Sequence, residues 1–175
     1  MPKAQEKVVD INDKKNEKKK RKIDANTFIQ KIRIDKKTDI PEIYYSERNE
    51  KNDKTVILKG AAEPLDSFLQ AMQALSTVFC EICEMEEKVE DVTITTVNFS
   101  PKGGVIISGQ VELTNGVPQP LCLNTPHIMI KNESGGYELP QYAQEQIEEL
   151  KKQAIMYAQG EAKAVQQDLF DGTND

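Results

Sequence analysis

Two rhythms of apolar and polar positions divide this chain into helical and extended segments. Over residues 64–85, apolar side chains recur every three or four positions, which places them on one side of a helix. These positions are Leu65, Phe68, Leu69, Met72, Leu75, Phe79, Ile82 and Cys83. Pro64 suits the first helical turn, because its missing N–H costs little there. This segment has the apolar surface needed to cover a sheet, so we expect the fold to be built around it.

Alternation with a period of two predicts strands before and after this helix. The expected strands cover residues 28–35, 43–47, 55–59, 92–99, 105–113 and 121–130. In the first of them, one face is expected to carry Phe28, Ile32 and Ile34, and the other Lys31, Arg33 and Asp35. Within residues 92–99 the apolar positions change parity, which indicates a bulge or burial on both faces. Thr125-Pro126 is expected to bend or break the last strand.

A second long helix is expected to open at Pro140 and to run to about Gln159, or on to Val165. Its apolar positions alternate spacings of four and three, like a coiled-coil seam. They are Ala143, Ile147, Leu150, Ala154, Tyr157 and Ala164. The order of elements predicts an α+β fold, in which an antiparallel sheet of about five to six strands packs on one long helix, with an appended C-terminal helix. The seam leaves open that this helix pairs with a second copy in a homo-oligomer.

Composition divides the 175 residues into four parts. We expect a disordered basic arm over residues 1–25, an α+β domain over 26–138, the C-terminal helix over 139–165 and a flexible acidic tail over 166–175. The cations of the arm are Lys14, Lys15, Lys18, Lys19, Lys20, Arg21 and Lys22. Such a segment favours salt-sensitive, sequence-independent contact with DNA phosphates. A solvated solubility tail is the alternative.

The net charge of −6 gives no support to nucleic-acid binding over the whole surface. Three cysteines, an odd number, favour a reducing compartment over a disulfide framework. No apolar run approaches the roughly 20 residues of a membrane span. Residues 1–22 lack the apolar segment of a signal peptide. We therefore expect a soluble cytoplasmic protein with no membrane partner.

Four side chains could together form a zinc site, namely Cys80, Cys83, Cys122 and His127. Against this, Cys83 belongs to the apolar helix face, and free cysteines are common core residues. Buried thiols are therefore the favoured interpretation, and no cofactor is expected. His127 is the only histidine and has no nucleophile signature near it. No motif proposes an enzyme, so a non-enzymatic role is expected.

The most specific motif is Gln166-Gln167-Asp168-Leu169-Phe170. It resembles the peptide with which polymerases, repair enzymes and replication accessory proteins dock on the bacterial sliding clamp. The resemblance implies that Leu169 and Phe170 enter an apolar pocket while Gln166 hydrogen-bonds to the pocket rim, and Asp168 is among the residues accepted at its position. Two apolar anchors between acidic residues are typical of a short-peptide hot spot. The alternative is that both anchors fold back onto the last helix.

Three further segments resemble small proteins encoded by phages and prophages, a group without an assigned activity. They are Glu63-Pro64, Glu81-Ile82-Cys83-Glu84 and Leu123-Asn124-Thr125-Pro126-His127. The sequence thus favours a phage-type accessory protein of DNA replication or recombination, or a host-takeover protein, that docks on the sliding clamp. Two alternatives stay open: a single-stranded DNA-binding protein with the sheet as its platform, and a homo-oligomeric interaction protein.

Overall fold

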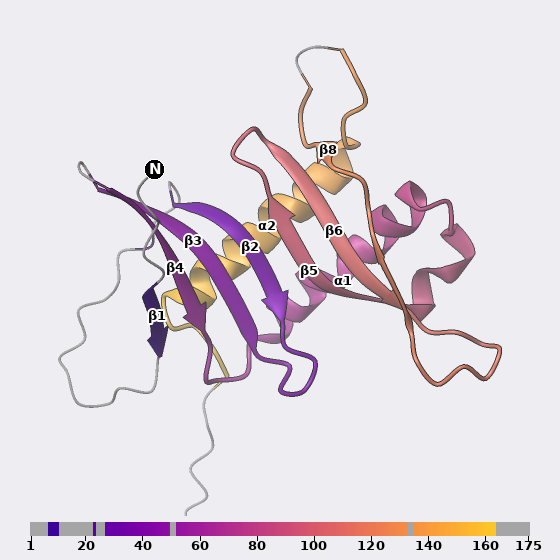
Figure 1. Ribbon diagram of the computed structural model, residues 1–175, viewed down its shortest axis with the longest axis horizontal. Helices are drawn as coiled ribbons and strands as arrows, with labels where there is room; N and C mark the ends of the chain where they lie inside the picture. The colour runs from indigo at the N-terminus through magenta and orange to yellow at the C-terminus, as the bar shows by residue number, and fades with distance from the viewer. Residues whose placement is uncertain (1–6, 11–22, 24–26, 50–51, 133–134, 164–175) are drawn as a thin grey trace, which may run out of the picture.

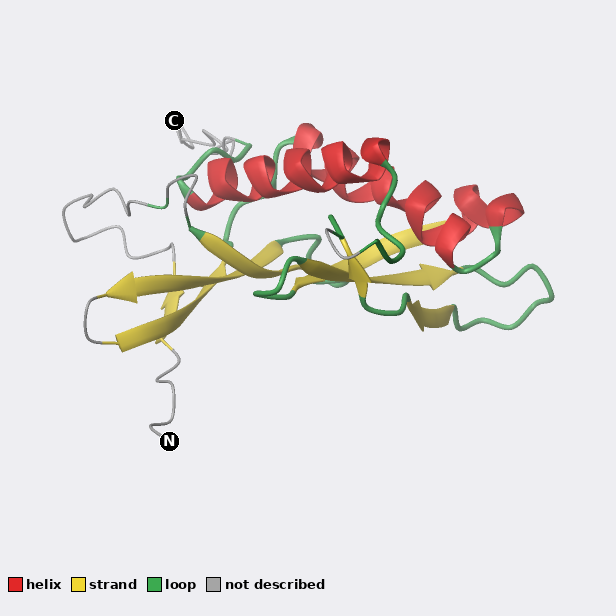
Figure 2. Cartoon of the chain, turned by 90° about the horizontal axis from the view of Figure 1, so that it is seen from above, coloured by secondary structure: helices red, strands yellow, loops and turns green. Residues whose placement is uncertain are grey.

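A sheet and two helices form two layers in the computed structural model, which describes residues 7–10, 23, 27–49, 52–132 and 135–163. Figure 2 shows both helices on the same side of the sheet. The α+β class, with a largely antiparallel sheet and two helices, is confirmed.

The sheet contains eight strands in the part of the chain that the structure describes, more than the expected five to six. They are β1 (Lys7–Asp10), β2 (Phe28–Ile34), β3 (Pro41–Asn49), β4 (Asn52–Lys59), β5 (Val92–Phe99), β6 (Gly104–Val111), β7 (Leu121–Asn124) and β8 (Ile128–Met129). Their order is β1-β4-β3-β2-β5-β6-β7, and β8 pairs with β6. The expected last strand is split into β7 and β8 around Thr125-Pro126, as its sequence predicted.

Two segments of the expected disordered arm are placed in the fold. The backbone of β1 runs parallel to β4, with Lys7 opposite Val56, and so covers the edge that β4 would otherwise expose. Ile23 is 4% exposed, and its carbonyl accepts a 2.6 Å hydrogen bond from Gln159 Nε2. The expectation of disorder over residues 1–25 is therefore wrong for these positions, whereas residues 14–22 lie outside the described part of the chain.

The pairing of two strands contains a register shift. In β5 the pairing with β6 shifts between Ile94 and Thr96, which confirms the bulge that the change of parity predicted. In β2 the pairing with β3 shifts between Ile29 and Lys31. This second bulge was not foreseen, and it places Ile29 instead of Phe28 among the fully buried residues with Ile32.

Helix α1 (Asp66–Ile82) packs against β5 and β6 through the predicted face. Phe68, Met72, Leu75 and Phe79 are all at most 2% exposed. The Phe79 ring lies so close to β6 that a Cβ at Gly109 would be 3.1 Å from it. Pairing with a glycine lets this ring sit directly on the sheet. A short 3-10 helix, η1 (Glu86–Asp91), then leads into β5.

Helix α2 (Gln141–Ala158) lies beside α1 and is part of the core instead of an appendage. Ala143, Ile147, Leu150 and Ala154 are all 0% exposed. The expectation of an appended helix is corrected, because the spacing of apolar positions defines a face but not the surface that covers it. That face is already buried within the chain, so a second copy would have to bind elsewhere.

Candidate functional site

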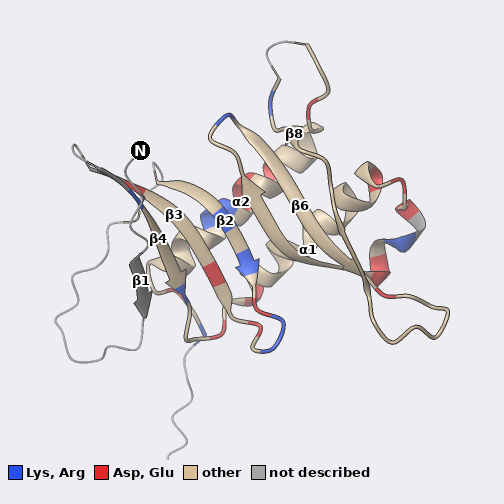
Figure 3. Cartoon of the chain, viewed as in Figure 1, with Lys and Arg blue, Asp and Glu red and all other residues tan. Residues whose placement is uncertain are grey.

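Helices α1 and α2 both lie on one face of the sheet, and neither covers the opposite face (Figure 2). Because strand side chains alternate between faces, the positions between core residues point here. On β2, β3, β5 and β6 these positions include Lys31, Arg33, Glu42, Tyr44, Thr96, Asn98, Ser108 and Gln110. Charged positions lie across β2, β3 and β4, whereas β5 and β6 contain none (Figure 3). The open face is therefore neutral and polar on one side and charged on the other.

Five residues of β2, β3 and β4 form a cluster that we call the cationic corner: Lys31, Arg33, Glu42, Tyr44 and Lys59. The strand register places Lys31 opposite Tyr44, and Glu42 between Arg33 and Lys59. The Lys31 ammonium lies 5.2 Å from the centroid of the Tyr44 ring. Glu42 accepts a 3.2 Å hydrogen bond from the Tyr44 hydroxyl. One carboxylate thus holds the corner together.

The two ion pairs of this corner are long and leave the cations accessible. Arg33 Nη1 lies 3.8 Å from Glu42 Oε2, and Lys59 Nζ lies 3.7 Å from Glu42 Oε1. The Arg33 and Lys59 side chains are 48% and 55% exposed, whereas the Glu42 side chain is 14% exposed. The guanidinium has five N–H donors, and Glu42 can occupy only some of them. The corner can therefore accept an external anion.

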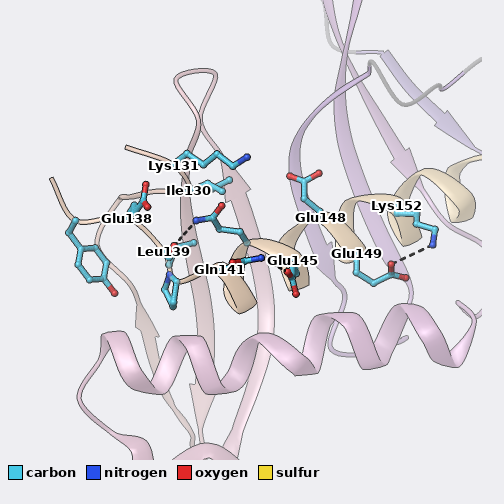
Figure 4. Close-up of a pocket in the computed structure, with 12 residues that line it drawn as sticks. Ile130, Lys131, Glu138, Leu139, Gln141, Glu145, Glu148, Glu149 and Lys152 are labelled. Atoms are coloured by element: carbon cyan, nitrogen blue, oxygen red, sulfur yellow. Dashed lines mark hydrogen bonds and ion pairs between the residues drawn. The ribbon is translucent and has the colours of Figure 1, made fainter. Parts of the chain in front are cut away.

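An open groove of about 940 Å³ lies in the helix layer, between α2 and residues 130–140 (Figure 4). Its four carboxylates belong to Glu138, Glu145, Glu148 and Glu149. Each of them accepts a hydrogen bond from this chain. Glu138 accepts one from the Asn132 N–H at 2.8 Å, and Glu145 one from Gln141 Nε2 at 3.0 Å. Glu148 accepts one from Lys151 Nζ at 2.9 Å, and Glu149 one from Gln153 Nε2 at 2.7 Å. The hydrogen bond from Gln153 lowers the pKa of Glu149. The four carboxylates of the groove are therefore already hydrogen-bonded within this chain.

The possible zinc ligands are not brought together. Cys80 is buried in α1 and Cys83 follows its last turn, where burial raises the pKa of the Cys83 thiol. Cys122 is exposed on β7, and Gln110 Nε2 lies 3.1 Å from its sulfur. The His127 ring lies over Gly104, where a Cβ would be 2.0 Å from Nε2. Within the described ranges, no group of three or more His, Cys, Asp or Glu residues is arranged to hold a metal ion.

Both sequence motifs lie outside the described residues: the basic segment 14–22 and the clamp-like segment 166–170. Lys163, the last described residue before the second of them, contacts the segment that leads into α1. The Lys163 N–H donates a 2.9 Å hydrogen bond to the Glu63 carbonyl, and Lys163 Nζ lies 2.8 Å from Asp66 Oδ1. The hydrogen bond and charge of Asp66 raise the pKa of Lys163. The clamp-like segment thus follows a point fixed at the start of α1.

The cationic corner was missed by the sequence reasoning. Lys31 and Arg33 were expected on the polar face of their strand, but their neighbours on β3 and β4 depend on pairing that the sequence does not encode locally. Comparison with known proteins adds no assignment, since no family model, curated sequence or solved structure matches this chain. Among the described residues, neither helix combines the length and apolar character that crossing a bilayer requires.

Proposed function

We propose that this protein is a phage-type, non-enzymatic accessory protein of DNA replication or recombination that docks on the bacterial sliding clamp in the cytoplasm of the host. Docking is through Gln166, Asp168, Leu169 and Phe170. The observation that carries the proposal is the pentapeptide itself, whose two apolar anchors lie between Asp168 and the following Asp171. An aliphatic and an aromatic side chain of this kind fill a partner's pocket and dominate the binding energy of a short peptide.

The packing of α2 supports the proposal over a fold-back of the two anchors onto the last helix. The apolar seam that would receive them is filled by the chain's own core, with Ile147 and Leu150 both 0% exposed. The large exposed apolar side chains of the described residues are Val117, Leu121, Tyr137 and Tyr142. Tyr142 lies in the first turn of α2. At 1.5 Å per residue it is roughly 24 Å from the end of this helix. Near the end of α2, Ile155 and Met156 are partly buried, and none of the four strongly exposed apolar side chains lies on this turn.

Tethering to the clamp would raise the local concentration of the domain at the replication fork, so that each contact can be weak on its own. The same docking would also deny the pocket to host polymerases, which is the host-takeover form of the proposal. Competition with a polymerase-derived clamp peptide separates the two forms, because inhibition requires displacement of that peptide at cellular concentrations.

The test is calorimetric titration of the bacterial sliding clamp with the full chain. Leu169→Ala combined with Phe170→Ala should abolish binding, because both anchors are removed. Gln167→Ala is the matched control, since the motif accepts any residue at this position, and it should bind like the unmodified protein. Unchanged affinity of the double variant would remove the proposal.

A further inference from the structure

The open sheet face has the breadth to bind an extended polymer. From β4 to β6 it spans five adjacent strands, which at about 4.8 Å per strand gives a width of about 19 Å. The groove between α2 and residues 130–140 lies instead in the helix layer. A ligand of the sheet face would therefore lie across the strands and would not enter a pocket.

Charge on this face favours an anionic polymer. The cationic corner sets three cations against one carboxylate, in a chain whose net charge is −6. The contacts of Arg33 and Lys59 with Glu42 are long, at 3.8 Å and 3.7 Å, and both cations are about half exposed, so each can reach a phosphate while it stays near Glu42. Arg33 can also bind a phosphate through two parallel N–H bonds.

The remainder of the face favours a polymer with exposed flat rings and hydrogen-bonding edges. The Tyr44 ring already accepts a cation on its surface, from Lys31 at 5.2 Å. Beyond it, Thr96, Asn98, Ser108 and Gln110 offer neutral donors and acceptors on β5 and β6. The bases of a single strand present both rings and edges, whereas a duplex hides its base faces in the stack.

We infer that this face binds single-stranded DNA, with a base stacked on Tyr44 and phosphates held by Lys31, Arg33 and Lys59. Lys31 leaves the tyrosine ring for a phosphate as the base takes its place. Contact with a single strand follows from the sheet alone, while the choice of DNA over RNA rests on the proposed function. The domain would then hold DNA while the tail holds the clamp.

A single-tryptophan probe separates contact at the sheet from contact at the basic arm. The chain contains no tryptophan, so Tyr44→Trp introduces a unique fluorophore at the corner. Addition of an oligo(dT) of about 16 nucleotides, the upper end of known single-strand site sizes, should quench its fluorescence saturably. Tyr142→Trp is the matched control, because Tyr142 lies on α2 and donates its hydroxyl hydrogen bond to Glu81 of α1. Its fluorescence should not change.

Affinity variants test the assigned roles. Lys31→Gln with Arg33→Gln should reduce the slope of log K against log salt by about 1.4, at about 0.7 per phosphate contact on a single strand. The control Lys88→Gln with Lys152→Gln removes two cations from the helix layer and should leave the slope unchanged. Tyr44→Leu should weaken DNA binding at least fivefold, which is roughly the smallest loss expected when one stacked base loses its aromatic partner. Tyr44→Phe keeps the ring and should retain the affinity. Circular dichroism checks that each variant is folded.

Four results would overturn the inference: no binding of oligo(dT), binding without quenching at Tyr44→Trp, equal quenching at Tyr142→Trp, or a preference for oligo(rU) or duplex DNA. Leu169→Ala with Phe170→Ala should leave the quenching intact. Absence of clamp binding by the unmodified protein, with DNA binding retained, would therefore count against the proposed function alone. DNA binding absent from a protein that still docks on the clamp would count against this inference alone.

Discussion

Tyr157 fixes the last turn of α2 to the connection between β4 and α1. Its hydroxyl donates a 2.6 Å hydrogen bond to the Ala62 carbonyl, and its ring centroid lies 5.8 Å from that of Phe68. The side chain is 3% exposed. A Cβ at Gly60 would lie 1.8 Å from the hydroxyl oxygen and 2.7 Å from Cζ, so the ring fits only because residue 60 has no side chain.

Removing the hydroxyl should therefore destabilise the fold measurably. Tyr157→Phe keeps the ring but leaves the Ala62 carbonyl without its donor, which costs about 1–3 kcal/mol. Tyr157→Ala also empties the space of the ring and should cost about 3–5 kcal/mol. Gly60→Ala forces the ring to move and should cost about 1–3 kcal/mol. Its effect should be smaller in the Tyr157→Phe background, because the nearest clashing atom is then absent.

Urea unfolding followed by far-ultraviolet circular dichroism measures these free energies, provided that the m-value is unchanged. Tyr137→Phe is the matched control: it makes the same chemical change at a side chain that is 68% exposed, and it should shift the free energy of unfolding by less than about 0.5 kcal/mol. If Tyr157→Phe proved as stable as the unmodified protein, or if the two changes were additive, α2 would not be anchored at this contact.

Two further predictions use the same unfolding assay. Glu84 adopts a φ of 55° after α1, where the Met85 N–H donates a 2.8 Å hydrogen bond to the Cys80 carbonyl. Because glycine adopts a positive φ without strain, Glu84→Gly should stabilise the protein by about 1 kcal/mol. A destabilised variant would contradict the role given to this backbone conformation. Burial raises the pKa of Tyr157 to about 12, and burial with the neighbouring Glu81 raises that of Tyr142 to about 12. In the unfolded chain these two tyrosines ionise at their ordinary pKa, below that of the folded state. The free energy of unfolding should therefore keep its full value below about pH 10 and fall as the pH rises toward 12. Tyr157→Phe should flatten this fall, and an equally steep fall in that variant would refute the assignment.

Elements with a strong local period were predictable from the sequence. The α1 face of Phe68, Met72, Leu75 and Phe79 follows from spacing alone, and each of these residues is buried. The bulge in β5 is one of the two arrangements that the change of parity indicated, and the pairing with β6 shows that it is present. The bulge in β2 left no comparable signal, so the burial of Ile29 was not predicted, while Phe28 is only partly buried against the core.

The candidate site was less predictable, because it depends on strands far apart in the sequence. Glu42 meets Arg33 and Lys59 only through the pairing of β3 with β2 on one side and β4 on the other. Reading each strand separately identifies polar side chains on one face but not which of them adjoin. The two motifs that the sequence identified most readily, in residues 14–22 and 166–170, stay predictions, since they lie outside the described residues.

The sequence by itself determined the α+β class, the apolar faces of both helices and a tail motif typical of clamp-binding peptides. Tertiary structure alone decided that α2 shares the core with α1, that β1 pairs with β4, and that Arg33 and Lys59 meet at Glu42. The physical reason is the range of the interactions. Helical and strand periods arise between residues a few positions apart, whereas the covering of a face depends on which distant segment buries it most completely.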